Sequence, residues 1–347
     1  MIAAGPAGRR ILIVSDAWVP QVNGVVRTLA ATSAELLALG HDVLVIGPDR
    51  FATMPCPTYP GIRLALRPRR KLARMMSDYA PEALHIATEG PLGIAARRIA
   101  RRRGWRFTTA FHTRFPEYLH ARLRLPTGLA YAWLRRFHRA GEGLMVATPS
   151  LAAELAARGF TRVKPWSRGV DLAQFRTEPR EDWGLPRPVF LYVGRTAVEK
   201  NIGAFLALDL PGSKVVVGDG PERAALEREF PGVHFTGFRH GAALARAYAG
   251  ADVLVFPSLT DTFGLVILEA LACGTPVAAL PVTGPLDILG DHPGAGAIDA
   301  DLAAAARRAL AGDRAAARAL AETYSWRASA EAFLSHLVPI GLEVPDK

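Results

Sequence analysis

The stretch Ser258-Leu-Thr-Asp-Thr-Phe-Gly-Leu-Val-Ile-Leu-Glu269 places seven residues, including a Phe-Gly pair, between the acids Asp261 and Glu269. The apolar run Val253–Phe256 before it predicts a buried strand, and Val266–Cys273 is apolar at helical spacing until a glycine ends the pattern. The first N–H groups of a helix have no intrahelical partner, and the helix dipole favours negative charge there. This strand, loop and helix therefore predict an anion site at the helix start.

Strands and helices alternate through the rest of the chain. We expect strands in two series, at residues 10–14, 42–46, 83–86, 106–111 and 144–148, and at residues 189–193, 214–217, 253–256 and 275–279. Helices are expected between them, at residues 25–39, 93–103, 129–140, 151–158, 266–273 and 302–310. With 347 residues, the chain is predicted to be an α/β protein of two doubly wound Rossmann-like domains, joined by the Pro- and Arg-rich stretch 178–188.

The two halves of the chain differ in charge. Residues 1–165 hold 25 Lys and Arg against 10 Asp and Glu, a difference of +15, and residues 166–347 hold 17 against 22, a difference of −5, which together give the net charge of +10. Basic residues alternate with apolar ones around Leu64, Leu66, Leu72, Met75 and Met76. This pattern suits an anionic membrane surface, although solvated helix faces in an arginine-rich protein have the same pattern. No recognition motif supports nucleic acid as a partner.

Targeting signals and cysteines point to the cytoplasm. No apolar run approaches the roughly 20 residues of a membrane-spanning helix, and residues 1–10 lack the apolar segment and cleavage site of a signal peptide. Cys56 and Cys273 are far apart in unrelated contexts, which indicates a reduced protein without a disulfide framework. We therefore expect a cytoplasmic protein that associates peripherally with the cytoplasmic face of the membrane.

Two segments of the first half follow predicted strands and carry polar residues. In the first, the pair Asn23-Gly24 lets the backbone turn with positive φ and approach a ligand closely, although such turns are also common without a function. In the second, His112 directly follows a strand, with Arg114 and Tyr118 nearby. Ligands of doubly wound sheets bind beyond the carboxyl ends of the strands, so His112 is a candidate for the active site.

Four motifs resemble those of retaining glycosyltransferases of family 4. The segment that ends at Glu269 resembles the family's Glu-x7-Glu signature, although Asp261 is one methylene shorter than the usual Glu. The segment Gly194–Asn201 resembles its Gly-Arg-x4-Lys-Asn pattern, and Gly218–Pro221 its Gly-x-Gly-Pro turn. The loop with Asn23-Gly24 is similar to its glycine-rich loop. The resemblance implies the GT-B fold, in which two doubly wound Rossmann-like domains face each other across a cleft.

The resemblance also implies roles for these residues. His112 and Asp261 would contact the transferred sugar. Arg195 and Lys200 would clamp the donor diphosphate, and Glu269 would hold the ribose. Fixed cations suit this chemistry, because negative charge accumulates on the nucleoside diphosphate as the glycosidic bond breaks. The predicted donor-binding residues are Gly24, Gly194, Gly218, Gly220, Phe238, Thr262, Phe263, Gly264 and Leu265, and the predicted acceptor-binding residues are Asn23, Arg114 and Tyr118.

The family's architecture and chemistry add further expectations. Residues 1–165 would bind the acceptor, residues 166–325 would bind the nucleotide-sugar, and a helix in residues 326–347 would cross back onto the first domain. Retention of anomeric configuration is implied, with the donor phosphate taking the acceptor proton. No metal or other cofactor is expected, because the two cations already balance the diphosphate. We interpret Asp299-Ala-Asp301 as a helix N-cap rather than a metal motif.

The substrate is predicted from a narrower resemblance. Residues 22–28 and 260–266 resemble those of lipid glycosyltransferases, including diacylglycerol and sulfoquinovosyl glycosyltransferases and mannosyltransferases. We predict transfer of a hexose, glucose or glucuronic acid, from a UDP-sugar to a membrane lipid such as diacylglycerol. The alternative within the class is a GDP-mannose-dependent α-mannosyltransferase making glycolipid or polysaccharide. The alternatives from other classes are a non-catalytic basic membrane adaptor and a nucleotide-sugar isomerase.

Overall fold

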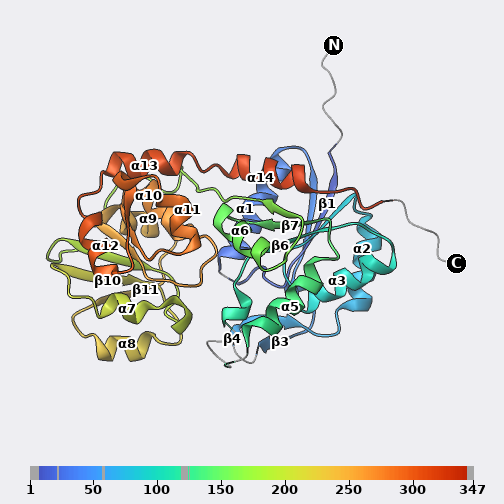
Figure 1. The fold of residues 1–347 in the computed structure, drawn as a ribbon, viewed down its shortest axis with the longest axis horizontal. Helices are drawn as coiled ribbons and strands as arrows, with labels where there is room; N and C mark the ends of the chain where they lie inside the picture. Colours follow the sequence, from blue (N-terminus) through green and yellow to red (C-terminus); the bar gives the residue numbers. More distant parts are fainter. Residues whose placement is uncertain (1–7, 22, 57–58, 119–123, 125, 342–347) are drawn as a thin grey trace, which may run out of the picture. The chain divides into compact units, whose positions relative to one another are not determined.

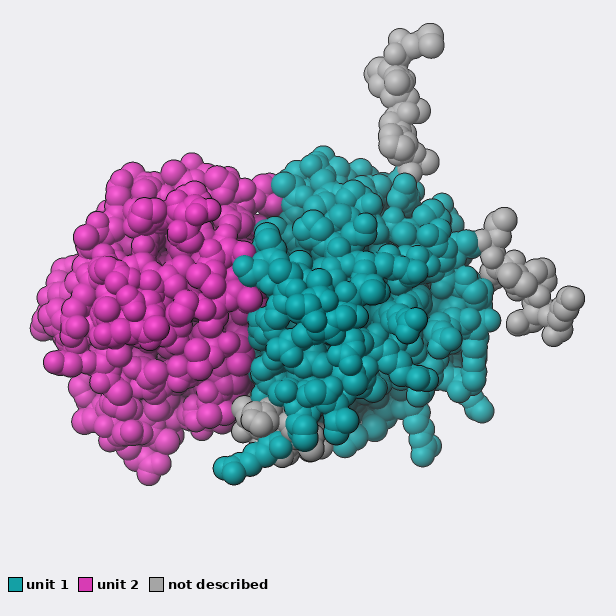
Figure 2. Space-filling view, in the orientation of Figure 1, with its two compact units in different colours: residues 1–167, 326–347 teal, residues 168–325 magenta. Residues whose placement is uncertain are grey.

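The chain forms two compact units (Figures 1 and 2). Each unit is built around a six-stranded parallel sheet. The computed structural model describes residues 8–21, 23–56, 59–118, 124 and 126–341. Unit 1 comprises Met1–Ser167 and Trp326–Lys347, and unit 2 comprises Arg168–Ser325. Within the described ranges, no helix combines the length and apolar character needed to cross a bilayer. The prediction of two doubly wound Rossmann-like sheets is confirmed.

The sheet of unit 1 has the strand order β2-β1-β5-β6-β7-β8, and all pairs are parallel. The chain moves from β1 outward to β2 and then returns to the other side of β1 at β5, so the strand order reverses between β1 and β5. Ligands of doubly wound sheets bind beyond the strand ends at such a reversal. The strands are β1 (Arg10–Val14), β2 (Asp42–Ile46), β5 (Ala83–Ile86), β6 (Thr108–Phe111), β7 (Gly143–Val146) and β8 (Val163–Pro165).

Successive side chains of β1 point to opposite faces of the sheet, so the core of unit 1 lies in two layers. Leu12 and Val14 pack with α2 and α3 on one face of the sheet, whereas Ile11 and Ile13 pack with α1 and α14 on the other. Helix α14 packs against α1 although it follows unit 2 in the chain. The helices of unit 1 are α1 (Gly24–Ala38), α2 (Arg69–Tyr79), α3 (Pro91–Arg102), α5 (Thr127–His138), α6 (Pro149–Ala157) and α14 (Trp326–His336), with a short 3-10 helix at Pro48–Arg50.

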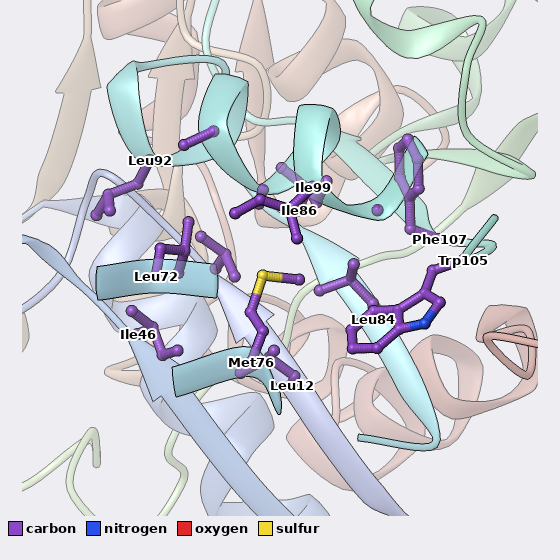
Figure 3. Close-up of a cluster of buried hydrophobic side chains, with 14 of the residues drawn as sticks. Leu12, Ile46, Leu72, Met76, Leu84, Ile86, Leu92, Ile99, Trp105 and Phe107 are labelled. Atoms are coloured by element: carbon purple, nitrogen blue, oxygen red, sulfur yellow. The ribbon is translucent and has the colours of Figure 1, made fainter. Parts of the chain in front are cut away.

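The segment between β2 and β5 differs from the sequence prediction. It forms a hairpin of β3 (Thr53–Cys56) and β4 (Tyr59–Ala65) followed by α2, and none of these elements was predicted. On α2, Leu72 and Met76 are completely buried in the same cluster as Leu12 (Figure 3). The prediction that these two side chains belong to a surface for membrane binding is therefore wrong, because the apolar side of α2 covers the sheet.

The sheet of unit 2 has the order β11-β10-β9-β12-β13-β14, again with parallel pairs. Its strand order reverses between the neighbours β9 and β12. The strands are β9 (Val189–Val193), β10 (Ser213–Val217), β11 (His234–Gly237), β12 (Val253–Phe256), β13 (Val277–Ala279) and β14 (Gly296–Ile298). The helices are α7 (Ile202–Leu206), α8 (Arg223–Glu229), α9 (Gly241–Gly250), α10 (Leu265–Ala272), α11 (Thr283–Leu289), α12 (Leu302–Ala309) and α13 (Arg314–Glu322), with 3-10 helices at Val198–Lys200 and Pro293–Ala295.

The stretch 178–188, which the sequence indicated as a linker, lies on unit 2. The backbone N–H of Glu181 donates to the carbonyl of Arg246 at 3.0 Å, and the Arg187 guanidinium pairs with the Asp252 carboxylate at 2.8 Å. The chain instead passes between the units at residues 167–168 and again at residues 325–326. The linker prediction is wrong because the Pro and Arg residues of this stretch serve local turns and ion pairs.

Candidate active site

The loops after β9 and β12 meet where the strand order of unit 2 reverses. The first loop carries Arg195 and Lys200, and the second carries Asp261. Lys200 Nζ donates to Asp261 Oδ1 at 2.5 Å, and the two side chains are 24% and 20% exposed. The fold thus brings together two predicted catalytic residues that lie 61 positions apart, in an ion pair that solvent reaches.

Two further hydrogen bonds connect these loops. Asn201 Nδ2 donates to the carbonyl of Pro257 at 3.1 Å, and Thr260 Oγ1 donates to the carbonyl of Glu199 at 3.1 Å. Asn201 has a left-handed backbone conformation (φ 54°) between the 3-10 helix and α7, a conformation that Asn tolerates better than most residues. The Lys-Asn pair of the motif therefore supplies both a charge and a turn.

Glycines let the strand ends of unit 2 approach each other closely. Gly218 has φ 148°, and a Cβ there would lie 1.8 Å from the carbonyl oxygen of Gly194. The N–H of Gly194 donates to the carbonyl of Val217 at 3.0 Å, so the pairing of β9 with β10 continues past the strand ends. A Cβ on Gly220 would lie 2.4 Å from the carbonyl oxygen of Thr196. Only glycine permits these contacts, which bring the backbones of the two loops together.

The N-terminus of α10 has no capping side chain because its N-cap residue is Gly264. Gly264 has φ 92°, and a Cβ there would come within 3.0 Å of the Phe256 ring. The neighbouring Phe263 is 5% exposed and contacts the Tyr324 ring edge-on at 6.1 Å, which fixes the turn. The N–H of Leu265 and the positive end of the helix dipole therefore lie at a turn without a capping side chain. Helix starts of this kind bind phosphate groups in other proteins. Thr262 lies in the same loop.

Glu269 lies inside α10 and is 2% exposed. Its Oε2 accepts a hydrogen bond from the hydroxyl of Tyr248, a completely buried residue of α9, at 2.8 Å. Helical side chains lean toward the N-terminus of their helix, so the carboxylate is directed toward the first turn of α10. Tyr248 thus fixes the carboxylate that the sequence predicts to hold the ribose.

The turn that carries Arg195 is closed by Tyr192. The Tyr192 hydroxyl donates to the carbonyl of Arg195 at 2.7 Å. Burial raises the pKa of Tyr192, so the phenol stays neutral and remains a donor. Burial and the charge of Glu199 raise the pKa of Glu222, so these two acids lie close enough to interact. The loop therefore mixes charges of both signs.

Phe238 presents an aromatic ring just beyond β11. The ring is 62% exposed and stacks on His240 with centroids 6.1 Å apart. On the other side of the strand end, a Cβ on Gly237 would come within 3.0 Å of the Arg223 guanidinium, which pairs with Asp219 at 3.3 Å. An exposed ring at this edge offers a flat surface on which a base can stack.

In unit 1, the loop after β6 carries the predicted residues His112, Arg114 and Tyr118. The His112 ring contacts Trp166 edge-on at 5.4 Å. Arg114 Nη1 and Nη2 donate to the two carboxylate oxygens of Glu154 at 2.9 and 2.6 Å, and this hydrogen bonding lowers the pKa of Glu154. The guanidinium therefore braces the loop against α6, a role that the sequence did not reveal. Tyr118 is partly exposed in the same loop.

The loops after β1 and β5 form the corresponding reversal point of unit 1. Asn23 caps α1, its Oδ1 accepting from the N–H of Val26 at 3.0 Å. Asn23 is extended (φ −155°) and Gly24 begins the helix, so the predicted turn with positive φ is wrong. Asp16, which the sequence did not single out, accepts hydrogen bonds from the N–H groups of Leu92 at 2.8 Å and Gly93 at 3.2 Å. Burial raises the pKa of Asp16. The protein's own carboxyl group thus occupies the start of α3.

The two reversal points therefore differ in what they can bind. In unit 1 the helix start that could hold an anion is filled by Asp16, whereas in unit 2 α10 starts at a glycine without a capping side chain, on the loop whose Asp261 pairs with Lys200. A phosphate at α3 would have to displace the Asp16 carboxyl group from the N–H groups of Leu92 and Gly93. The geometry favours unit 2 as the unit that binds a diphosphate.

The Asp-x-Asp segment of unit 2 has a structural role. Asp301 accepts a hydrogen bond from the N–H of Ala303 at 2.9 Å and caps α12. Asp299 accepts from the N–H of Asp301 at 2.9 Å and pairs with Arg308 at 2.6 Å. The N-cap interpretation is confirmed for Asp301, whereas Asp299 supports the turn before the helix.

Replacement of Gly218 by alanine tests the close backbone approach. The Cβ clash and the positive φ predict a loss of about 3 kcal/mol or more in the free energy of unfolding, together with weaker binding of nucleoside diphosphates. Gly203→Ala is the matched control, because a Cβ on Gly203 meets no atom within 4 Å and Gly203 lies in α7. Urea denaturation and calorimetric titration would measure both effects. Equal stability of the two variants would contradict the close approach.

Comparison with known proteins agrees with this geometry. Residues 22–174 match the family model "Glycosyltransferase Family 4", and residues 187–312 match the model "Glycosyl transferases group 1". A GDP-mannose-dependent alpha-mannosyltransferase of Mycobacterium tuberculosis is 32% identical over 311 residues, covering 82% of each chain. The sulfoquinovosyl transferase SQD2 of Arabidopsis thaliana is 31% identical over 326 residues, 82% of this chain and 61% of that protein. An alpha-monoglucosyldiacylglycerol synthase of Streptococcus pneumoniae is 27% identical over 314 residues, 78% of this chain and 70% of that protein.

The fold is shared with solved structures at lower sequence identity. A sucrose-phosphate synthase from Thermosynechococcus elongatus superposes with a TM-score of 0.73 at 23% identity, covering 94% of this chain and 98% of that chain. The two parallel sheets are those of GT-B glycosyltransferases. The resemblance found in the motifs is confirmed, and the chain belongs to glycosyltransferase family 4.

Proposed function

We propose that this glycosyltransferase moves a hexose, glucose or glucuronic acid, from a UDP-sugar to a hydroxyl group of a membrane lipid such as diacylglycerol. The observation that carries the proposal is the arrangement at the unit 2 reversal point, where the Lys200 ammonium pairs with Asp261, three residues before the uncapped glycine that begins α10. Both features suit a diphosphate. The names of the diacylglycerol-processing and sulfoquinovosyl relatives support a sugar donor and a lipid acceptor.

The cations act on the leaving group. As the bond to the sugar breaks, negative charge grows on the β-phosphate, and Arg195 and Lys200 stabilise that charge more in the transition state than in the ground state. The N–H groups at the start of α10 add a fixed positive potential. With this charge supplied by the chain, the reaction needs no metal ion.

The proposed reaction retains the configuration of the sugar. The hydroxyl of the acceptor attacks from the face that the diphosphate leaves, and an oxygen of the leaving phosphate takes its proton, so no side chain has to act as a nucleophile. His112 and Asp261 contact the sugar and Glu269 holds the ribose in this proposal. The position of Asp16 supports an acceptor without a phosphate group. Its carboxyl group already occupies the start of α3, the helix start in unit 1 that would otherwise hold a lipid phosphate.

A second candidate is an α-mannosyltransferase that uses GDP-mannose. It is favoured by the mannosyltransferase of M. tuberculosis, which is 32% identical to this chain. The two candidates share the diphosphate chemistry and differ in the base and the sugar. Phe238 can stack on uracil or guanine, so an experiment with different donors is needed to distinguish the two candidates.

A thermal-shift panel with UDP, GDP and ADP, followed by transfer assays with the matching sugar donors and extracted lipid, tests the proposal. We expect UDP to raise the melting temperature most, a lipid-linked product with retained anomeric configuration, and the same rate in the presence of EDTA. A larger shift with GDP and product from GDP-mannose would replace the first candidate by the second. Epimerised donor without an acceptor would identify an isomerase instead.

Lys200→Ala is expected to lower turnover about a hundredfold or more, the usual effect of losing one charged transition-state contact. The exposed Arg228→Ala in α8 is the matched control, since it removes one positive charge from the same unit and is expected to leave turnover unchanged. Initial rates at saturating donor would be compared for the two variants. Near-normal turnover of the Lys200 variant would rule out its role at the leaving group.

Glu269→Gln is expected to weaken donor binding more than turnover. The substitution keeps the shape of the side chain and the hydrogen bond from Tyr248, but it replaces a carboxylate that can accept from ribose hydroxyls by a neutral amide. Calorimetric titration with the donor nucleotide would show about a tenfold or larger increase in Kd, in line with the loss of a charged hydrogen bond. An unchanged Kd would remove the ribose assignment.

We also propose that unit 1 binds an anionic membrane surface through α5 and α3. Leu129 and Trp133 on α5 are 73% and 42% exposed, and Arg136 continues the same helix face. Arg97 of α3 donates to the carbonyl of Arg136 at 2.9 Å, so the two helices lie side by side. Burial and the charges of Arg101, Arg136 and Arg98 lower the pKa of Arg97. This crowding of positive charge beside exposed apolar side chains suits anionic headgroups, at about 1 kcal/mol per basic residue.

Trp133→Ser is expected to release the protein from vesicles that contain anionic lipid. Binding of the unmodified protein should fall as salt rises, because the attraction is screened. Leu286→Ser is the matched control, as Leu286 is 43% exposed on α11 of unit 2. Vesicle co-sedimentation at low and high salt gives the measurement. Salt-insensitive binding, or equal loss in the two variants, would contradict the proposed surface.

A further inference from the structure

Trp166 is a completely buried residue that touches three other rings. Its ring contacts His112 edge-on at 5.4 Å, with an interplanar angle of 71°. It also contacts Phe333 at 4.9 Å and His85 at 5.8 Å. His112 is the residue of this group that lies in a loop beyond a strand end, whereas His85 lies within β5 and Phe333 within α14. The cluster therefore connects the core of unit 1 to a candidate active-site residue.

The position of Trp166 is fixed from two directions. Its backbone N–H donates to the carbonyl of Val146 at 2.7 Å, which continues the pairing of β7 with β8. Helix α14 holds the adjoining residues, with Ser329 Oγ donating to the carbonyl of Ser167 at 2.7 Å and His336 bonded to the carbonyl of Pro165 at 2.7 Å. Phe333 lies between these two contacts on the same helix. Helix α14 thus clamps the end of β8 and supports the indole ring.

An immobile indole limits the orientations of the imidazole that rests on it. A histidine in a surface loop can rotate about both side-chain torsions, and an edge-on contact with a large fixed ring favours one arrangement. A group held in the productive orientation before the substrate binds does not have to be ordered during the reaction. The ring contact is therefore expected to act on turnover through His112.

We infer that Trp166 is a positioning residue for His112, and that α14 supports it through Phe333. The inference rests on the proposed role of His112 in glycosyl transfer. Helix α14 comes from the part of the chain after unit 2, so this contact gives the C-terminal segment a part in the active site as well as in the core of unit 1.

The test compares Trp166→Leu with Trp105→Leu. Trp105 is 5% exposed and belongs to the core cluster on the other face of the same sheet, so its loss measures the effect of a buried tryptophan away from His112. We expect Trp166→Leu to lower kcat about tenfold with a donor KM within about twofold, and Trp105→Leu to leave kcat within about twofold. Trp166→Phe, which keeps an aromatic ring, should recover most of the lost kcat.

The imidazole signals of His112 in NMR spectra give a readout that does not depend on turnover. Assigned by their loss in His112→Gln, they should shift in Trp166→Leu and stay in place in Trp105→Leu, because the ring current of Trp166 acts on them directly. If Trp166→Leu does not fold, Phe333→Leu loosens the same ring from behind and takes its place.

The outcomes distinguish a failure of the inference on Trp166 from a failure of the proposed role of His112. Normal kcat and unshifted His112 signals in Trp166→Leu would overturn the inference, provided that His112→Gln is inactive. If the unmodified protein transfers no sugar from any donor, or if His112→Gln keeps full turnover, the proposed function of His112 fails instead. In that case shifted signals would still establish that the Trp166 ring lies against the His112 ring.

Discussion

The ion pair between Lys200 and Asp261 depends on a constraint of parallel sheets, in which every strand ends at the same edge. The loops after β9 and β12 leave that edge as neighbours, so residues 61 positions apart in the chain lie 2.5 Å apart in space. Glycine at position 218 lets the third loop approach equally closely, because any Cβ there would collide with the backbone of Gly194. The charge, the turn and the start of α10 therefore come from the loops after β9 and β12, and glycine at position 218 lets the loop after β10 pack against the first of them.

The two units use the same architecture and treat the helix start at the reversal point in opposite ways. In unit 2, Gly264 leaves the positive end of α10 without a capping side chain, whereas in unit 1, Asp16 places a carboxyl group at the start of α3. A helix N-terminus that already holds one anionic group stabilises a second one poorly, because the first occupies its free N–H groups. A side-chain carboxyl group at the helix N-terminus stabilises the fold at that point. A helix N-terminus without such a group can still bind an anion from solution. The two sheets also differ in strand order, because unit 1 has one strand beyond β1 and unit 2 has two strands beyond β9.

Much of the fold could be predicted from local patterns, because buried parallel strands such as Val189–Val193 are continuous apolar runs. The order of the motifs along the chain also indicated the residues around Lys200. Other features depend on distant contacts that no local pattern contains. The apolar side of α2 has the same spacing whether Leu72 meets lipid or the sheet, and only the fold decides between them. Asp16 bonds with Leu92 across 76 positions, and Trp166 meets His112 through the tertiary packing of α14.

If Lys200 acts on the leaving diphosphate, as we propose, its pairing with an acid has a consequence for catalysis. A lysine that already holds a carboxylate exchanges one anion for another when a diphosphate arrives, so its net gain in the ground state is small. The net stabilisation by the ammonium rises when the bond to the sugar breaks, because the phosphate then carries a further unit of negative charge and attracts the ammonium more strongly than the carboxylate does. An ion pair in the resting site therefore shifts the benefit of the ammonium from binding toward turnover. It also keeps the ammonium in place, through Asp261, on a loop that two more hydrogen bonds hold to its neighbour.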